Sequence, residues 1–119
     1  MPVSEDRRDE FLKRLSTVGF GPRESLQVLL GNIVYDVREQ VVHKRFRDDE
    51  MDRVVRFHDA AEALWRDTMK SDPPLPSADV LERVQTLRAL CVDPLSQYVR
   101  KLKHGIRHAE ELVKAHARR

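Results

Sequence analysis

The chain has 119 residues, which is the size of a single domain. Charged residues make up 35% of it and hydrophobic residues 40%, a balance too apolar for a disordered chain and too polar for a membrane span. The single cysteine, Cys91, excludes an intrachain disulfide and a zinc site built on paired cysteines.

Apolar residues recur at helical spacing, which predicts an all-α fold of about five helices in one domain, 1–119. The first 21 residues are expected to form a helix from Ser4 to Val18, with Ser4 as its N-cap, followed by a turn. The polar, acidic start of this segment is unlike a secretory signal or a cleavable mitochondrial presequence, so we expect neither.

A helical hairpin is expected over residues 22–70. Its first helix runs from Pro22 to Val41, and its second runs from an Asp48 cap to Met69. We place a turn near Arg47, since charged residues would otherwise continue the core stripe; one unbroken helix is the alternative. The core-facing residues are predicted to be Leu26, Leu29, Leu30, Ile33, Val34, Val37 and Val41 on the first helix, and Met51, Val54, Val55, His58, Ala61, Leu64, Trp65 and Met69 on the second.

A proline-rich linker is expected over 71–76, with two C-terminal helices over 77–119. The first of these helices would be capped by Ser77 and end near Val92, and Asp93-Pro94 would open the second. Their predicted buried faces are Val80, Leu81, Val84, Leu87 and Cys91, and then Leu95, Tyr98, Val99, Leu102, Ile106, Ala109, Val113 and Ala117.

The net charge of +2 hides a polarised chain. From Pro94 onward seven Lys and Arg face two Glu, a net of +5, whereas the first 93 residues carry 15 basic and 18 acidic groups, a net of −3. Such a long basic helix favours a negatively charged partner. Nucleic acid, acidic lipid headgroups and an acidic protein surface all fit that charge. Aromatic interleaving is missing, so we expect no nucleic acid and favour a protein partner.

Two groups of residues have the spacing of reactive sites. His104, His108 and Glu111 have the helical spacing of metal ligands, but they lie opposite the apolar stripe, and a solvated basic face explains them better. Arg38 to His43 and Arg53 to His58 share an Arg-x-x-x-x-His spacing. This spacing resembles the motif of small helical HEPN ribonucleases, yet about two Arg/His pairs with a spacer of four to six residues are expected by chance among 16 Arg and 5 His. We therefore assign no catalytic, cofactor-binding or metal-binding residue.

Three short stretches, in order, resemble subunit 7 of the mitochondrial cytochrome bc1 complex (ubiquinol–cytochrome c reductase). They are Val37-Arg38-Glu39, the run from Asp48 to Arg56, and the run from Pro94 to Leu102, which is followed by Glu110-Glu111 and Lys114. Leu75-Pro76 falls where the family has a Leu-Pro turn. The chain departs from the family in a longer segment after Asp59, in the place of Trp65, and in a more basic last helix.

The resemblance implies a non-catalytic accessory subunit of respiratory complex III. Such a subunit lies on the matrix side of the mitochondrial inner membrane, has no transmembrane helix, and supports assembly through contacts with cytochrome b and the core subunits. The residues expected to contact partners are Arg53, Arg56, Tyr98, Arg100, Lys101, Lys103, Arg107 and Lys114.

Two other functions remain open on the residues alone. A helical adaptor could form a homodimer through the Leu26 to Val41 stripe and bind partners with its basic helix. A small ribonuclease could use Arg38 and His43.

Overall fold

The computed structural model describes residues 21–117, and the predicted helix from Ser4 to Val18 lies outside them. This part of the chain is all-α, as predicted, with four α-helices. Their bounds are α2 Pro22–Val42, α3 Met51–Met69, α4 Ser77–Ala89 and α5 Val99–Ala117. Short 3-10 turns, η1 Asp48–Glu50 and η2 Ser96–Tyr98, precede α3 and α5.

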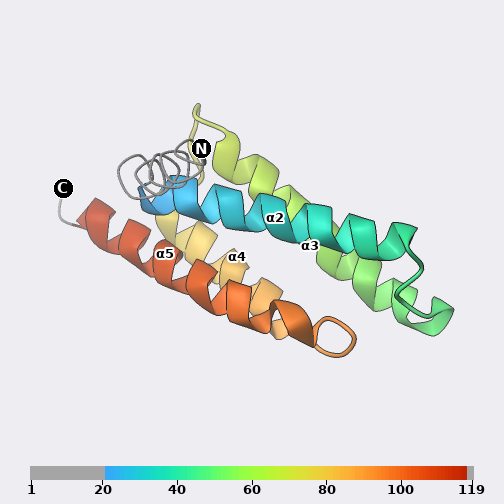
Figure 1. The fold of residues 1–119 in the computed structure, drawn as a ribbon. Helices are drawn as coiled ribbons and strands as arrows, with labels where there is room; N and C mark the ends of the chain where they lie inside the picture. Colours follow the sequence, from blue (N-terminus) through green and yellow to red (C-terminus); the bar gives the residue numbers. More distant parts are fainter. Residues whose placement is uncertain (1–20, 118–119) are drawn as a thin grey trace, which may run out of the picture.

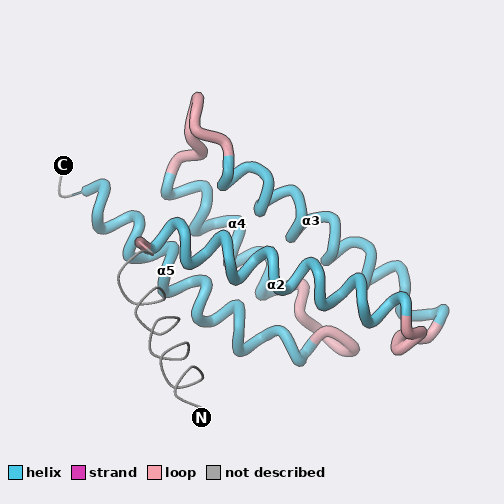
Figure 2. Tube along the Cα trace, turned by 45° about the horizontal axis from the view of Figure 1, so that its top comes forward, coloured by secondary structure: helices cyan, strands magenta, loops and turns pink. Residues whose placement is uncertain are grey.

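The four helices form an up-and-down bundle (Figures 1 and 2). α2 packs against α3 and α5, and α4 also packs against α3 and α5. Each helix thus has two neighbours and turns one stripe inward. The buried core consists of Leu26, Leu30, Ile33, Val34, Val37, Val54, Phe57, Ala61, Leu64, Val80, Val84, Leu87, Cys91, Leu95, Tyr98, Leu102, Ala109 and Leu112.

The hairpin of α2 and α3 has nearly the predicted bounds, and the alternative of one unbroken helix is wrong. Residues 43–47 connect the two helices and include the predicted turn near Arg47; within this connection Lys44 adopts a left-handed conformation with φ 53°. Asp48 is not the cap that we expected. Asp48 is instead the first residue of η1, whose N-cap is Arg47, and the N-cap of α3 is Glu50. The backbone N–H of Arg47 donates to Glu50 Oε1 over 2.8 Å.

Two polar side chains of α2 bind the far end of α3. Arg23 Nη1 and Gln27 Nε2 donate to the carbonyl oxygen of Thr68 over 3.2 and 2.7 Å. Arg23 Nη2 donates to the carbonyl of Leu75 in the linker. The bonds to Thr68 satisfy a carbonyl that the end of α3 leaves without a helical partner, and together the three bonds hold the start of α2 level with the end of α3.

Both predicted starts of the C-terminal helices need correction. Ser77 is not a cap: it is the first residue of α4, is 8% exposed, and its Oγ lies 2.7 Å from Nδ1 of His116 on α5. Asp93 and Pro94 form a turn, and α5 begins only at Val99. The Ser96 hydroxyl donates to the Asp93 carboxylate over 2.8 Å and holds this turn outside the helix.

The buried faces of α3 and α5 are rotated from those predicted. On α3, Phe57 and Thr68 are buried, whereas Val55 and Met69 are about half exposed. On α5, Gly105 and Leu112 belong to the buried face. The predicted α3 stripe therefore combined residues of the core with residues of an outer surface.

Candidate functional site

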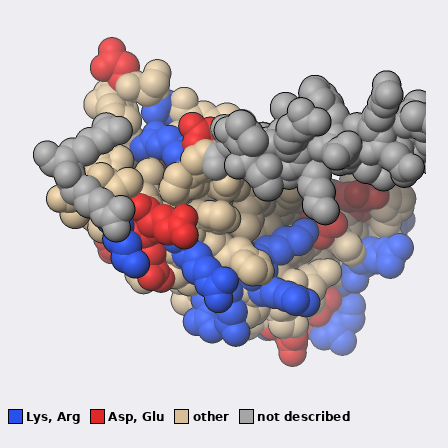
Figure 3. All heavy atoms as spheres, turned by 60° about the vertical axis from the view of Figure 1, so that its left-hand side comes forward, with Lys and Arg blue, Asp and Glu red and all other residues tan. Residues whose placement is uncertain are grey.

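The predicted basic residues do lie on the surface. Arg53 and Arg56 are exposed on α3, and Arg100, Lys101, Lys103, Arg107 and Lys114 are exposed on α5. In Figure 3, Lys and Arg gather over the lower part of the face, the side on which α5 lies, with acidic groups between them. Among the described residues, none of the ion pairs involves a side chain of α5. Its positive charge is therefore not neutralised by side chains of the other described helices.

Tyr98 does not belong with these surface residues. It is 1% exposed, stacks on Phe57 with ring centroids 5.7 Å apart, and donates a hydrogen bond to Asp36 Oδ2 over 2.7 Å. Burial raises its pKa above the usual value of 10.0, and the neighbouring Asp36 carboxylate adds to the rise. The expectation that Tyr98 contacts a partner is corrected: its side chain attaches η2, which leads into α5, to α2 and α3.

The two Arg-x-x-x-x-His motifs exchange partners in the fold. Arg38 on α2 donates from Nε to Nε2 of His58 on α3 over 2.9 Å, so the arginine of one motif meets the histidine of the other. His43, the expected partner of Arg38, lies at the end of α2, with its Nε2 3.9 Å from Glu39 Oε1. The structure therefore does not bring Arg38 and His43 together as a site.

The Arg38 and His58 pair is the centre of a small polar network. Because Nε2 of His58 accepts from Arg38, the ring proton is on Nδ1, which donates to Asp59 Oδ1 over 3.0 Å. Arg38 also forms an ion pair with Glu62, which is 3.2 Å from Arg66 as well. The charges at the centre of this surface thus neutralise one another.

This network lies midway along an exposed surface of the α2 and α3 hairpin, which we call the hairpin face. Five residues from each helix, spaced alternately three and four apart, make up this face: Val28, Gly31, Tyr35, Arg38 and Val42 on α2, and Val55, His58, Glu62, Trp65 and Met69 on α3. Such spacing keeps them on one side of each helix. Where the two rows meet, Trp65 contacts Tyr35 edge to face at 5.8 Å and covers Gly31, where an added Cβ would lie 3.2 Å from the indole.

Exposed apolar side chains concentrate on this hairpin. Seven large hydrophobic residues among those described are exposed, and six of them are on α2 or α3. They are Val28, Tyr35, Val41, Val42, Val55 and Met69, and the seventh is Val92 in the loop after α4. The sequence did carry a signal for this surface, because Val28, Tyr35 and Val42 are seven residues apart, but only the core stripe of α2 was predicted from it.

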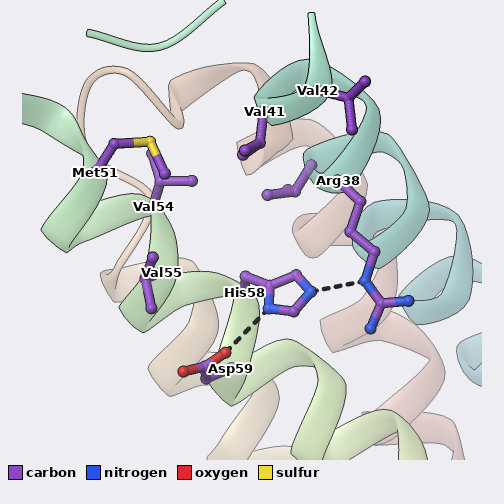
Figure 4. Close-up of a pocket in the computed structure, with 9 residues that line it drawn as sticks. Arg38, Val41, Val42, Met51, Val54, Val55, His58 and Asp59 are labelled. Atoms are coloured by element: carbon purple, nitrogen blue, oxygen red, sulfur yellow. Dashed lines mark hydrogen bonds and ion pairs between the residues drawn. The ribbon is translucent and has the colours of Figure 1, made fainter. Parts of the chain in front are cut away.

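One end of the hairpin face opens into an apolar groove of about 440 Å³ (Figure 4). Figure 4 shows the Arg38 and His58 hydrogen bond at one side of the groove and the valines and Met51 around the rest. The lining residues are Val37, Arg38, Val41, Val42, Met51, Val54, Val55, His58 and Asp59. The groove suits an apolar side chain that approaches from outside the chain.

Within residues 21–117, no three His, Cys, Asp or Glu side chains come together in a way that could hold a metal ion. None of the helices described is long and apolar enough to span a membrane. Comparisons of the chain with profiles of protein families, with curated proteins and with solved structures each found no significant match.

Proposed function

We propose that the protein is a non-catalytic interaction subunit that packs its hairpin face against another protein surface. The observation that carries this proposal is the concentration of exposed apolar residues on α2 and α3, most of them in the two neighbouring rows of the hairpin face. A helix that is apolar on both sides is typical of one that is buried on both sides. α2 fits this description, since Leu26, Leu30 and Val34 enter the core while Val28 and Tyr35 face outward.

Cross-linking in a native extract tests this proposal. A photoreactive p-benzoylphenylalanine in place of the exposed Tyr35 should give one defined, stoichiometric protein adduct, and the same group in place of Gln85 on α4 should not. Val42→Lys should abolish the adduct at position 35, whereas Val92→Lys should leave it. Adducts of equal yield at both positions, or none at position 35, would refute the proposal.

Complex III is the specific assembly that we propose, on the strength of the resemblance to subunit 7. The run from Asp48 to Arg56 begins α3, the run from Pro94 to Leu102 leads into α5, and the stack of Phe57 on Tyr98 holds these two parts at one end of the bundle. In this proposal Arg53, Arg56, Arg100 and Lys101 would contact cytochrome b or the core subunits on the matrix side. Native gels of solubilised mitochondria should show the chain comigrating with cytochrome b; free monomer outside mitochondria would refute it.

The ribonuclease has less support. The guanidinium of Arg38 is paired with Glu62 and bonded to His58, which leaves it poorly placed to stabilise a phosphate beside His43. Cleavage of RNA by the purified chain that is lost in His43→Ala would nevertheless replace our proposal.

A further inference from the structure

We infer that the hairpin face is the interface of a homodimer, in which it is covered by the same face of a second copy. This inference rests on the proposed function and names the partner. It differs from a dimer through the Leu26 to Val41 stripe, because the core of the bundle already takes up most of that stripe. The second copy would instead meet residues that the bundle leaves exposed.

The apolar residues of the hairpin face favour a self-complementary contact. They lie at both of its ends, with Val28 and Met69 beyond Trp65 at one end and Val42 and Val55 beside the groove at the other. The polar network of Arg38, His58 and Glu62 lies between them. Consider a two-fold axis that lies in the plane of contact, crosses the middle of the face and is perpendicular to the helices. It would place the Val28 end of each copy on the Val42 end of the other. Homodimers with a two-fold axis require this kind of self-complementarity.

The charges of the face point to the same occupant. Arg38 and Arg66 both meet Glu62, and His58 donates to Asp59, so the face carries no excess charge that would attract nucleic acid or an acidic membrane. Asp59 and Arg66 lie on α3 on opposite sides of Glu62, and their side chains are 71% and 69% exposed. The same two-fold axis places Arg66 of each copy near Asp59 of the other, which adds complementary charges to the apolar contacts.

The mass of the purified full chain in solution tests this inference. Sedimentation equilibrium at micromolar concentrations of the chain should give a mass twice the 13.9 kDa of one chain. Val42→Lys and Val28→Lys, one at each end of the face, should each raise the dimer dissociation constant by about tenfold or more. Both valines are at least half exposed, and circular dichroism and thermal melts should show that the variants stay folded.

Val92→Lys is the matched control, because Val92 is 51% exposed but lies outside the hairpin face. It should leave the dissociation constant unchanged. Wild-type chain that stays at 13.9 kDa throughout the concentration range, or a dimer that responds equally to all three substitutions, would overturn the inference.

The photoreactive variant at position 35 separates this inference from the proposed function. An adduct between two copies of the chain supports both. A monomeric chain whose adduct is with a different protein, and is lost in Val42→Lys, overturns the homodimer while the interaction function stands. A monomeric chain without any adduct specific to position 35 overturns both.

Discussion

Arg38 and His58 are joined by a 2.9 Å hydrogen bond, although each lies in a different Arg-x-x-x-x-His motif. The bond crosses from α2 to α3 at the centre of the hairpin face, and Glu62 and Asp59 complete its surroundings. These side chains therefore have a structural role, which is to set the register of the hairpin and neutralise its outer surface.

Replacing Arg38 should test that role. We expect Arg38→Ala to lower the free energy of unfolding by about 1 kcal/mol, since the residue joins an ion pair, a hydrogen bond and a cation–π contact with Tyr35 but is partly exposed. Arg56→Ala, at an exposed position of α3, should cost less than about 0.5 kcal/mol. Urea denaturation measures both, and equal losses would contradict the role of Arg38.

The buried hydroxyl of Tyr98 should contribute more than an exposed one. Tyr98→Phe removes the hydrogen bond to Asp36 and leaves that carboxylate without its donor, so it should cost about 1–2 kcal/mol of unfolding free energy. The matched control is Tyr35→Phe, because Tyr35 is 60% exposed; its effect should stay within about 0.5 kcal/mol. Thermal and chemical denaturation should rank the two in this order.

Gly105 lies where α5 meets α2 and α4. An added Cβ there would be 3.4 Å from Leu29 and Val84, which is ordinary van der Waals contact. Gly105→Ala should therefore raise the free energy of unfolding by up to about 1 kcal/mol through helix propensity. Gly105→Leu should lower it by about 1–3 kcal/mol, because the larger side chain overpacks the interface. Calorimetric melting of both variants provides the measurement.

Asp67 links stability to acidic pH. Hydrogen bonds from Arg83 and Lys70 hold the pKa of its carboxyl below the ordinary 3.8. Because the pKa of Asp67 is lower in the folded than in the unfolded chain, its ionised carboxylate stabilises the fold above pH 3.8. This stabilisation is lost as the pH falls through the pKa of the folded state. The difference in melting temperature between wild type and Asp67→Asn should thus shrink below pH 3.8. A difference that stays constant down to the lowest pH would contradict the ion pairs.

Cys91 links stability to alkaline pH. Burial raises the pKa of its thiol from 9.0 to about 11. Because the pKa of this thiol is higher in the folded than in the unfolded chain, the neutral thiol contributes its full stabilisation below pH 9.0. That stabilisation is lost as the pH rises from 9.0 to about 11. The stability of wild type relative to Cys91→Ala should fall across this interval, as measured by denaturation at several pH values. Thiol reagents should also label the folded chain much more slowly than the unfolded chain at pH 8.

The sequence by itself determined the helices and much of the core. Proline at the start of α2 and the proline-rich linker after α3 mark element ends by fixing local backbone angles, and these bounds were predicted closely. Helical periodicity also identified Leu26, Leu30 and Ile33 as buried, because a continuous apolar stripe must be removed from water. The start of α5 was missed, since the side-chain bond from Ser96 to Asp93 helps to hold a turn that local preferences do not reveal.

Only the tertiary structure decided which apolar residues were left over. α2 and α3 each carry more apolar positions than one core stripe needs, and periodicity alone does not tell which neighbour covers which side. The antiparallel register of the two helices sends Phe57 inward and leaves Val55 outside, and it brings Arg38 to His58 instead of His43. Contacts between residues far apart in the chain depend on that register, so the seven-residue spacing of Val28, Tyr35 and Val42 does not by itself show that they share an exposed surface with residues of α3.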